Sequence, residues 1–211
     1  RGGKHVYCQK PIAHSVWEAR RLAEAAAQTR VQTQMGNQAH AGEPIRRAVE
    51  LLQAGVLGRV TEVHAWTNRP IWPQSSDTPR PTEKATPPDG MDWDLWCGPA
   101  PVRPYHPTYH PGKWRAWCDF GTGALGDMGC HIMGPPFKLL NLGYPHEVSG
   151  SASTTYSGVF KESAFPESGP ISSSLKYRFT LPNGKDLDLY WMDGGITPER
   201  LQALAPDVNM K

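Results

Sequence analysis

Hydrophobic residues in the first part of the chain recur at the spacings of strands and helices. Val6–Cys8 is a short apolar run that fits the end of a buried strand. Ser15-Val16-Trp17-Glu18 has the capping-box pattern, and small apolar residues follow it at helical spacing. A second strand is predicted over Val31–Met35, and a second helix begins near Pro44. Alternating strands and helices are typical of a parallel α/β sheet, which we expect for residues 1–58.

Beyond residue 58 the pattern changes to the alternation of a half-buried strand. Over residues 59–69, Val63 and Ala65 share one face, and His64 and Trp66 share the other. We therefore place the start of a second domain, residues 59–211, at this strand.

The last part of the chain is predicted to form antiparallel strands. The segment 146–157 is rich in Ser and Thr, residues 172–181 alternate, and Pro182-Asn183-Gly184-Lys185 is a strong hairpin signal. Six large apolar side chains in this hairpin exceed what a small helical layer can cover on both faces of a sheet: Leu175, Tyr177, Phe179, Leu187, Leu189 and Trp191. We therefore expect the outer face of the sheet to make a homo-oligomer contact.

A long segment between these regions is rich in proline and tryptophan. Eleven of the 21 prolines and six of the eight tryptophans lie within residues 66–118, which predicts an ordered connection with little regular structure. Flat aromatic side chains with polar edges suit packing against sugar rings, and they equally suit attachment of a long loop to a sheet. Both interpretations apply to Trp72, Trp93, Trp96, Tyr105, Tyr109 and Trp114.

The stretch Gly121–His131 is a glycine-rich entry to a helix that carries an acid and a histidine four residues apart. Asp127 and His131 would share one helix face and could reach one small ligand, although a dipole-stabilised acid and a core histidine give the same spacing. Four glycines weaken a helix, so close approach of another group to this backbone is the better explanation for them. Pro135 and Pro136 should kink the helix or end its first segment.

Composition excludes several classes of function. The 211 residues are 38% hydrophobic with a formal charge of +2, so we expect a globular protein without the basic stripe of a nucleic-acid-binding domain. No apolar run approaches the roughly 20 residues that cross a bilayer, so we expect no membrane contact. The four cysteines form no Cys-x-x-Cys pair, which indicates free thiols. Prolines around His106 and His110 argue against a helical metal site, and we expect no metal.

Several stretches in this order resemble the glucose–fructose oxidoreductase/inositol dehydrogenase/MocA family. Gly3–Pro11 is similar to the family's Gly-Lys-His-Val-x-x-Glu-Lys-Pro segment, and Gly126–His131 is similar to its Asp-x-x-x-His helix. Met35–Gln38 and Trp66–Gln74 resemble one sugar-acting branch. The resemblance implies an α/β plus α+β fold. Residues 1–58 would be the C-terminal part of a Rossmann-like NAD(P)-binding domain. Residues 59–211 would be a C-terminally incomplete substrate and oligomerisation domain, an open, mostly antiparallel sheet with helices on one face.

The resemblance also implies roles for individual residues. The family's lysine, aspartate and histidine fall on the candidate catalytic residues Lys10, Asp127 and His131. Histidine suits removal of a hydroxyl proton near neutral pH, and a lysine can stabilise a developing alkoxide. The cofactor, NAD or NADP, would contact Gln9, Lys10, Pro11 and Asn37. A carbohydrate substrate would contact Gln38, His40, Arg69, Trp72, Tyr105, Trp114 and Asp127.

Three positions depart from the family pattern. Gln9 stands where the family usually has glutamate, and Gly134 stands where close relatives often have aspartate. No Gly-x-Gly-x-x-Gly follows a predicted strand, so the phosphate-binding turn is missing and roughly 100 upstream residues are expected beyond this chain. We therefore expect the 211 residues alone to be inactive, and the whole protein to be cytoplasmic, with a periplasmic or secreted location left open.

The resemblance implies an NAD(P)-dependent oxidoreductase that acts on a sugar or polyol hydroxyl. One alternative is an NAD-dependent glycosidase of the same fold, which oxidises a ring carbon transiently and eliminates the glycosyl bond. The other is a non-catalytic, cofactor-less, sheet-forming subunit. The sequence leaves the identity of the sugar and the choice between NAD and NADP open.

Overall fold

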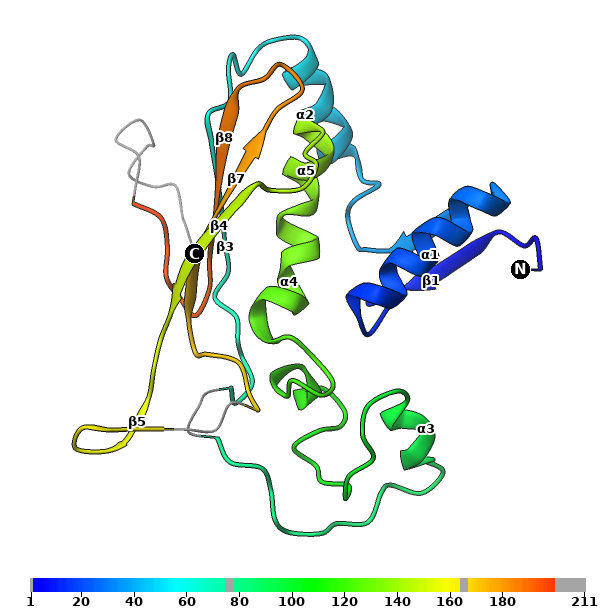
Figure 1. Cartoon of the computed structure of the whole chain (residues 1–211), viewed down its shortest axis with the longest axis vertical. Helices are drawn as coiled ribbons and strands as arrows, with labels where there is room; N and C mark the ends of the chain where they lie inside the picture. Colours follow the sequence, from blue (N-terminus) through cyan, green and yellow to red (C-terminus); the bar gives the residue numbers. More distant parts are fainter. Residues whose placement is uncertain (1, 75–77, 164–166, 200–211) are drawn as a thin grey trace.

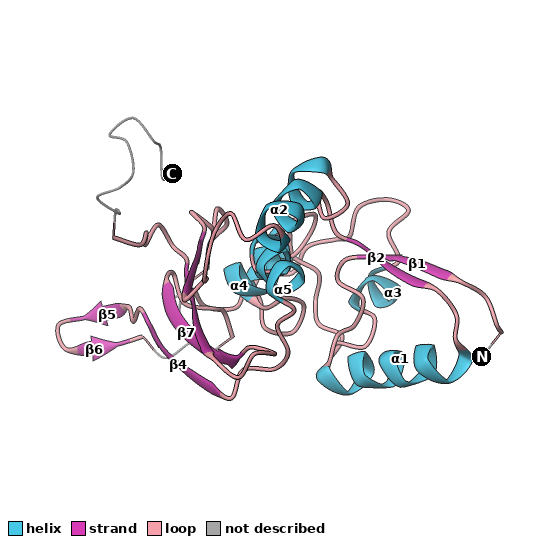
Figure 2. Cartoon of the chain, turned by 90° about the horizontal axis from the view of Figure 1, so that it is seen from above, coloured by secondary structure: helices cyan, strands magenta, loops and turns pink. Residues whose placement is uncertain are grey.

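A computed structural model describes residues 2–74, 78–163 and 167–199 (Figure 1). Its N-terminal unit consists of β1 (Val6–Gln9), α1 (Val16–Thr29) and β2 (Thr33–Gly36). β1 and β2 pair in parallel, and α1 runs alongside them (Figure 2). The Ser15 hydroxyl accepts the Glu18 amide at 3.2 Å, and the Glu18 carboxylate accepts the Ser15 amide at 2.9 Å. The predicted capping box is thus confirmed, and it fixes where α1 begins.

Helix α2 (Glu43–Gln53) begins at the predicted proline, because Pro44 in the first turn lacks only an amide that has no helical partner there. It packs against α5 (Gly134–Leu140), away from α1 and β1 (Figure 1). The domain boundary between residues 58 and 59 stays a prediction. In space, α2 lies with the helices of the second unit, although it precedes this boundary.

The second unit is built on a four-stranded sheet of β3 (Glu62–Trp66), β4 (Glu147–Ala152), β7 (Ser173–Thr180) and β8 (Asp186–Met192). The strand order is β3-β8-β7-β4, with β3 parallel to β8 and the other pairs antiparallel. The predicted mostly antiparallel sheet and the β7–β8 hairpin are confirmed. A short separate hairpin joins β5 (Tyr156–Gly158) to β6 (Lys161–Glu162).

The glycine-rich stretch forms α4 (Gly123–Ile132), and α5 follows after a single residue. Pro135 and Pro136 occupy the first turn of α5, where a missing amide costs little, so the prediction that they end the first segment is confirmed. Helices α2, α4 and α5 lie between the sheet and the β1–β2 pair (Figure 2). In the described part of the chain, helices therefore cover one face of this sheet.

The hydrophobic core lies under these helices. Phe179, Leu187 and Leu189 are at most 2% exposed and pack against Met133, Phe137 and Leu140 of the helical layer, among other residues. Trp191 is fully buried in the same sheet. These apolar groups lie on the helix side of the sheet, where Tyr177 is partly buried against the core, so they do not supply the apolar outer face from which the homo-oligomer contact was predicted.

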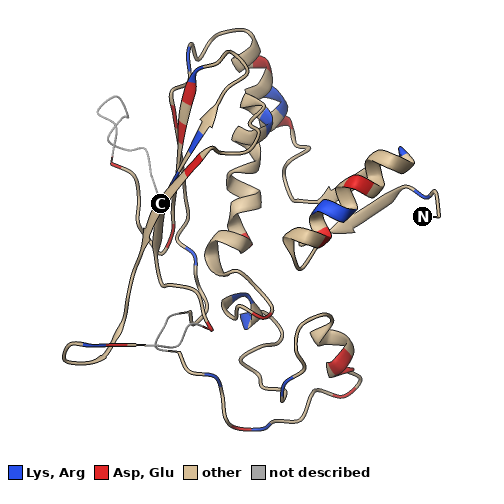
Figure 3. Ribbon diagram, viewed as in Figure 1, with Lys and Arg blue, Asp and Glu red and all other residues tan. Residues whose placement is uncertain are grey.

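The outer face of the sheet is charged instead. Asp188 pairs with Lys176 at 2.8 Å and with Arg178 at 2.9 Å, and Arg178 also pairs with Glu147 at 3.1 Å. Acidic and basic positions lie close together along the strands of this sheet (Figure 3). His64 of β3 stacks on Tyr190 of β8 at 4.9 Å between ring centroids. The homo-oligomer contact remains a prediction, and any partner at this face would meet polar and aromatic groups.

The long connection contains only α3 (Trp93–Cys97) and the 3-10 turn η1 (Lys113–Ala116) as helical structure. Its aromatic residues form a second core, in which buried Tyr109 and Trp117 contact Trp93, Trp96 and Phe120. For these aromatic residues the packing interpretation holds. No helix in the part of the chain that the structure describes is long and apolar enough to cross a bilayer.

We predict that Leu189→Ala destabilises the protein by about 2–5 kcal/mol, because it removes a fully buried side chain from a core that cannot collapse around the cavity. Leu95→Ala is the matched control, since Leu95 is 77% exposed and its loss should change the free energy of unfolding by no more than about 0.5 kcal/mol. Urea denaturation followed by tryptophan fluorescence measures both. Equal effects of the two variants would contradict the described core.

We predict that protonation of Asp188 lowers the stability of the fold at acid pH. Hydrogen bonds from Arg178 and then Lys176 lower the pKa of Asp188 from 3.8 to about 2. Because the folded-state pKa is depressed, its stabilisation is present above about pH 4 and is lost as the pH falls through about 2. In the Asp188→Asn variant the free energy of unfolding should depend less on pH over this window. In the control Asp89→Asn, at an exposed loop position, the pH dependence should be that of the wild type. A wild-type slope in Asp188→Asn would refute the assignment.

Candidate functional site

The predicted catalytic residues meet at one cleft. Lys10 directly follows β1, whereas Asp127 and His131 lie on α4. The carboxyl ends of parallel β1 and β2 open toward this point, which is where open α/β sheets place their ligands. The cleft has a volume of about 590 Å³ and is lined by Gln9, Lys10, Gly36, Gln38, Arg69, Ile71, Trp72, Gly112, Arg115, Asp127, Met128 and His131. Seven of the predicted site residues are therefore brought together.

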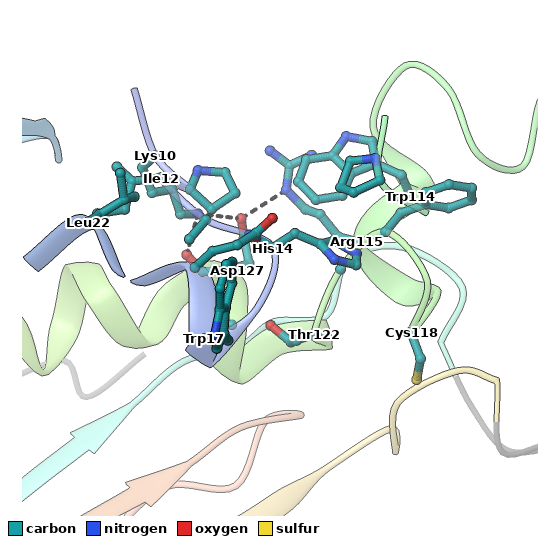
Figure 4. Close-up of a pocket in the computed structure, with 18 of the residues that line it drawn as sticks. Lys10, Ile12, His14, Trp17, Leu22, Trp114, Arg115, Cys118, Thr122 and Asp127 are labelled. Carbon is teal, nitrogen blue, oxygen red and sulfur yellow. Dashed lines mark hydrogen bonds and ion pairs between the residues drawn. The ribbon is translucent and has the colours of Figure 1, made fainter. Parts of the chain in front are cut away.

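The centre of the cleft is an ion-paired carboxylate. Lys10 Nζ lies 3.1 Å from Asp127 Oδ1 and 2.7 Å from the Asp127 carbonyl oxygen. Arg115 Nε donates to the same Oδ1 at 2.8 Å, so two cations hold one acid (Figure 4). Burial alone would raise the pKa of the Asp127 carboxyl, but hydrogen bonds from Arg115 and Lys10 outweigh it and lower that pKa below 3.8. Asp127 is therefore ionised at neutral pH.

The surroundings of His131 disfavour its charged form, whereas those of Asp127 favour the charged carboxylate. Burial, then the positive charge of Lys10, lowers the pKa of His131 below 6.5, and the Asp127 charge only partly offsets this. The imidazole is thus mostly neutral at pH 7 and can accept a proton. Asp127 makes its ion pairs with Lys10 and Arg115, and this geometry fits a carboxylate that positions Lys10.

Two predicted ligand residues tie the loop after β2 to α4. Asn37 Nδ2 donates to the Cys130 carbonyl oxygen at 2.8 Å and lies 3.0 Å from His40 Nε2. His40 Nε2 in turn lies 3.2 Å from the His131 carbonyl oxygen. Neither residue is among those that line the cleft, so the expected cofactor contact of Asn37 and substrate contact of His40 stay predictions. Both side chains contact main-chain carbonyl groups of α4 and so tie the loop after β2 to this helix.

Three further predicted residues lie away from the cleft. Tyr105 is 7% exposed and packs edge-to-face on Trp93 at 5.1 Å, so its expected sugar contact is replaced by a place in the aromatic core. Pro11 and Trp114 line a neighbouring cavity of about 700 Å³, which shares Lys10, Arg115 and Asp127 with the cleft (Figure 4). The Arg115 guanidinium lies 4.6 Å from the Trp114 ring centroid.

Arg115 is the functional residue that the sequence did not single out. It pairs with Asp127, donates to the Gly112 carbonyl oxygen at 3.1 Å and lines both cavities. The signal available was its place in Trp114-Arg115-Ala116-Trp117, where an arginine sits between two tryptophans just ahead of the glycine-rich stretch.

The glycines at the start of α4 are explained by close approach. A Cβ atom at Gly121 would lie 2.7 Å from the Arg115 Cα and carbonyl oxygen, and one at Gly123 would lie 2.7 Å from Gln74 Nε2. Gly123 also has a φ of +64°, which side chains other than glycine rarely adopt. The expected approach of another group is confirmed, and at these two glycines that group belongs to the chain itself.

Known structures share this fold across nearly the whole chain. A NAD binding oxidoreductase from Klebsiella pneumoniae matches with a TM-score of 0.56 at 21% identity, over 94% of this chain and 44% of that one. The Gal80p super-repressor mutant from Saccharomyces cerevisiae matches at 0.53 and 16%, over 92% and 43%. Aldose-aldose oxidoreductase from Caulobacter crescentus matches at 0.51 and 18%, over 89% and 43%. The chain thus spans less than half the length of each of these proteins.

The family comparison is more specific. Residues 42–153, more than half of the chain, match the model described as "Oxidoreductase family, C-terminal alpha/beta domain". This stretch includes α2, β3, the aromatic connection, α4 and α5, and with them Asp127 and His131. The chain therefore belongs to the glucose–fructose oxidoreductase/inositol dehydrogenase/MocA family of oxidoreductases.

Proposed function

We propose that the protein containing this chain is an NAD(P)-dependent oxidoreductase that moves a hydride between a nicotinamide cofactor and a sugar or polyol hydroxyl. The observation that carries the proposal is the meeting of Lys10, Asp127 and His131 in one cleft at the carboxyl ends of β1 and β2. Membership of an oxidoreductase family and likeness in fold to an NAD binding oxidoreductase support it.

The chain's residues divide the proton chemistry between them. A neutral His131 accepts the hydroxyl proton of the substrate, for which its lowered pKa suits it at pH 7. Lys10 donates a hydrogen bond to the same oxygen and stabilises the negative charge that develops there. Its ammonium group carries three donors, and the contacts to Asp127 leave capacity for the substrate.

Asp127 and Arg115 position the lysine. The Asp127 carboxylate is 11% exposed, and Lys10 and Arg115 hold it from two sides, so its place does not depend on solvent. A lysine on a loop would otherwise sample many rotamers, and the ion pair restricts it to the cleft. The pair therefore sets the geometry in which Lys10 meets the substrate oxygen.

The residues present fit one end of the cofactor. Gln9, Lys10, Gly36 and Gln38 line the cleft at the ends of β1 and β2. Asn37 Oδ1 close by is buried without a hydrogen-bond partner among the described residues. When bound, a nicotinamide cofactor supplies the hydride acceptor for the oxidation. The spacing Gly-x-Gly-x-x-Gly at 121–126 follows η1 instead of a strand, so we propose that these 211 residues alone bind the cofactor weakly and turn over no substrate.

One experiment separates the proposed function from its alternatives. The full-length protein is incubated with oxidised cofactor and a panel of aldoses, polyols and aryl glycosides, and the reduced cofactor and the released aglycone are both measured. A dehydrogenase accumulates reduced cofactor in step with product. A glycosidase regenerates its cofactor and releases aglycone, and a non-catalytic subunit does neither. Either of the last two results would overturn the proposal, provided that the panel includes the acid and phosphate forms of the sugars.

We predict that Lys10→Ala or His131→Ala in the full-length enzyme lowers kcat by at least about 100-fold, the usual contribution of a positioned acid–base group. Lys113→Ala and His146→Ala are the matched controls, since both side chains are exposed and line neither cavity. Steady-state kinetics on the four variants decide the matter. Near-wild-type turnover in the two site variants would refute the assigned roles.

We also predict the pH dependence of the oxidation. Because the pKa of His131 is lowered below 6.5, the base form persists on the acid side of neutrality, and kcat/KM should fall only with a midpoint below pH 6.5. His131→Ala should lose this limb in its residual activity. The measurement is kcat/KM for the substrate that shows the highest turnover, and a midpoint above pH 7 would contradict the neutral imidazole.

A further inference from the structure

The wall of the cleft carries an excess of positive charge. Lys10, Arg69 and Arg115 line it together with a single carboxylate, Asp127, which leaves two positive charges in excess. The lowered pKa of His131 keeps its imidazole from adding a third. A neutral sugar has no need of this field, so the excess points to a charged substrate.

Arg69 is the cation that no acid neutralises. Other partly buried arginines in the described chain have carboxylate partners, as Arg80 and Arg103 do with Asp119 and Arg178 with Asp188. The Arg69 guanidinium lies over the Trp72 ring at 5.9 Å from its centroid and makes no ion pair with any described residue. Its five donors therefore remain available in the cleft.

The Trp72 ring has two guanidinium groups as neighbours. The Arg115 guanidinium also lies 5.9 Å from the Trp72 centroid. The ring itself is fixed, because Trp72 Nε1 donates to Gln74 Oε1 at 2.9 Å and Gln74 Nε2 donates to the Pro170 carbonyl oxygen at 2.7 Å. Gln74 is 6% exposed, so this support is buried. Arg69 and Arg115 are thus arranged beside the candidate catalytic residues before any ligand arrives.

We propose that the substrate of this cleft is an anionic sugar, whose carboxylate or phosphate group binds Arg69, with Arg115 as a second contact. This inference rests on the proposed function and names its substrate class. The planar guanidinium fork matches carboxylate and phosphate oxygens in a two-point contact, and the Trp72 ring 5.9 Å away gives the guanidinium an aromatic neighbour inside the cleft. A hydroxyl of the same sugar then lies within reach of Lys10 and His131.

The test compares three probes in calorimetric titrations of the full-length protein with bound cofactor: D-glucuronate, D-glucose 6-phosphate and D-glucose. At least one anionic probe should bind at least about tenfold more tightly than D-glucose. Arg69→Gln should abolish that preference, because the anionic probe then loses the guanidinium that binds its charged group. Arg59→Gln, which removes the same charge from an exposed position outside the cleft, should keep the preference.

The outcomes separate the possible sources of the anion. Preference for the glucuronate identifies a carboxylate site, and preference for the phosphate ester identifies a phosphate site. Equal affinities for all three probes would overturn the proposal, as would an Arg69→Gln variant that loses reduced-cofactor affinity to the same degree, since Arg69 would then serve the cofactor. Hydride transfer is measured separately. If an anionic probe binds tightly but no reduced cofactor forms in the assay, this inference stands and the proposed function is refuted. If D-glucose is oxidised and no anionic probe is preferred, the proposed function stands and this inference is refuted.

Discussion

The ion pairs of Asp127 with Lys10 and Arg115 are the contact on which the site depends, because they join the loop after β1 to a residue 117 positions further along the chain and to a third segment beside it. Lys10 follows β1, Arg115 lies in η1, and Asp127 lies on α4. A nearly buried carboxylate is costly unless it is paired and hydrogen-bonded, so the three segments are held at this point by a requirement of charge. Loss of Asp127 would leave two cations side by side without their acid, which makes the arrangement sensitive to a change at that residue.

Apolar packing sets the position of the helix that carries this acid. The sheet presents Phe179, Leu187 and Leu189 to α5 and to the end of α4, so the helical layer cannot rotate without exposing that core. At its other end, α4 begins where the Arg115 main chain approaches Gly121 too closely for any side chain. Packing and close approach thus fix α4 at both ends, and the ion pairs add the exact register of Asp127 against Lys10.

Features encoded within one segment could be predicted from the sequence, whereas features that join distant segments could not. The capping box at Ser15, the prolines before α5 and the Asn183-Gly184 turn act locally, and each was placed correctly. The covered face of the sheet depends on a parallel pairing of β3 with β8, more than 100 residues apart, and its role was misjudged. Contacts with α4 give three side chains their places in the site, and no local sequence pattern predicts these contacts: they are Arg115, Asn37 and His40.

The fold leaves function undecided, since it is shared by an oxidoreductase and by a repressor mutant, so the argument rests on the chemistry of the cleft. A histidine beside a carboxylate normally becomes a better cation, because the acid stabilises the imidazolium. Here burial is the main cause that lowers the pKa of His131, and the positive charge of Lys10 lowers it further by more than Asp127 raises it, while the carboxylate is already occupied by Lys10 and Arg115. One lysine therefore has two effects in the proposed reaction, since it offers a donor to the substrate oxygen and adds to the effect of burial on the neighbouring imidazole. If Asp127 served only to stabilise α4 and His131 only to fill the core, neither residue would need a lysine donor beside it in a cleft.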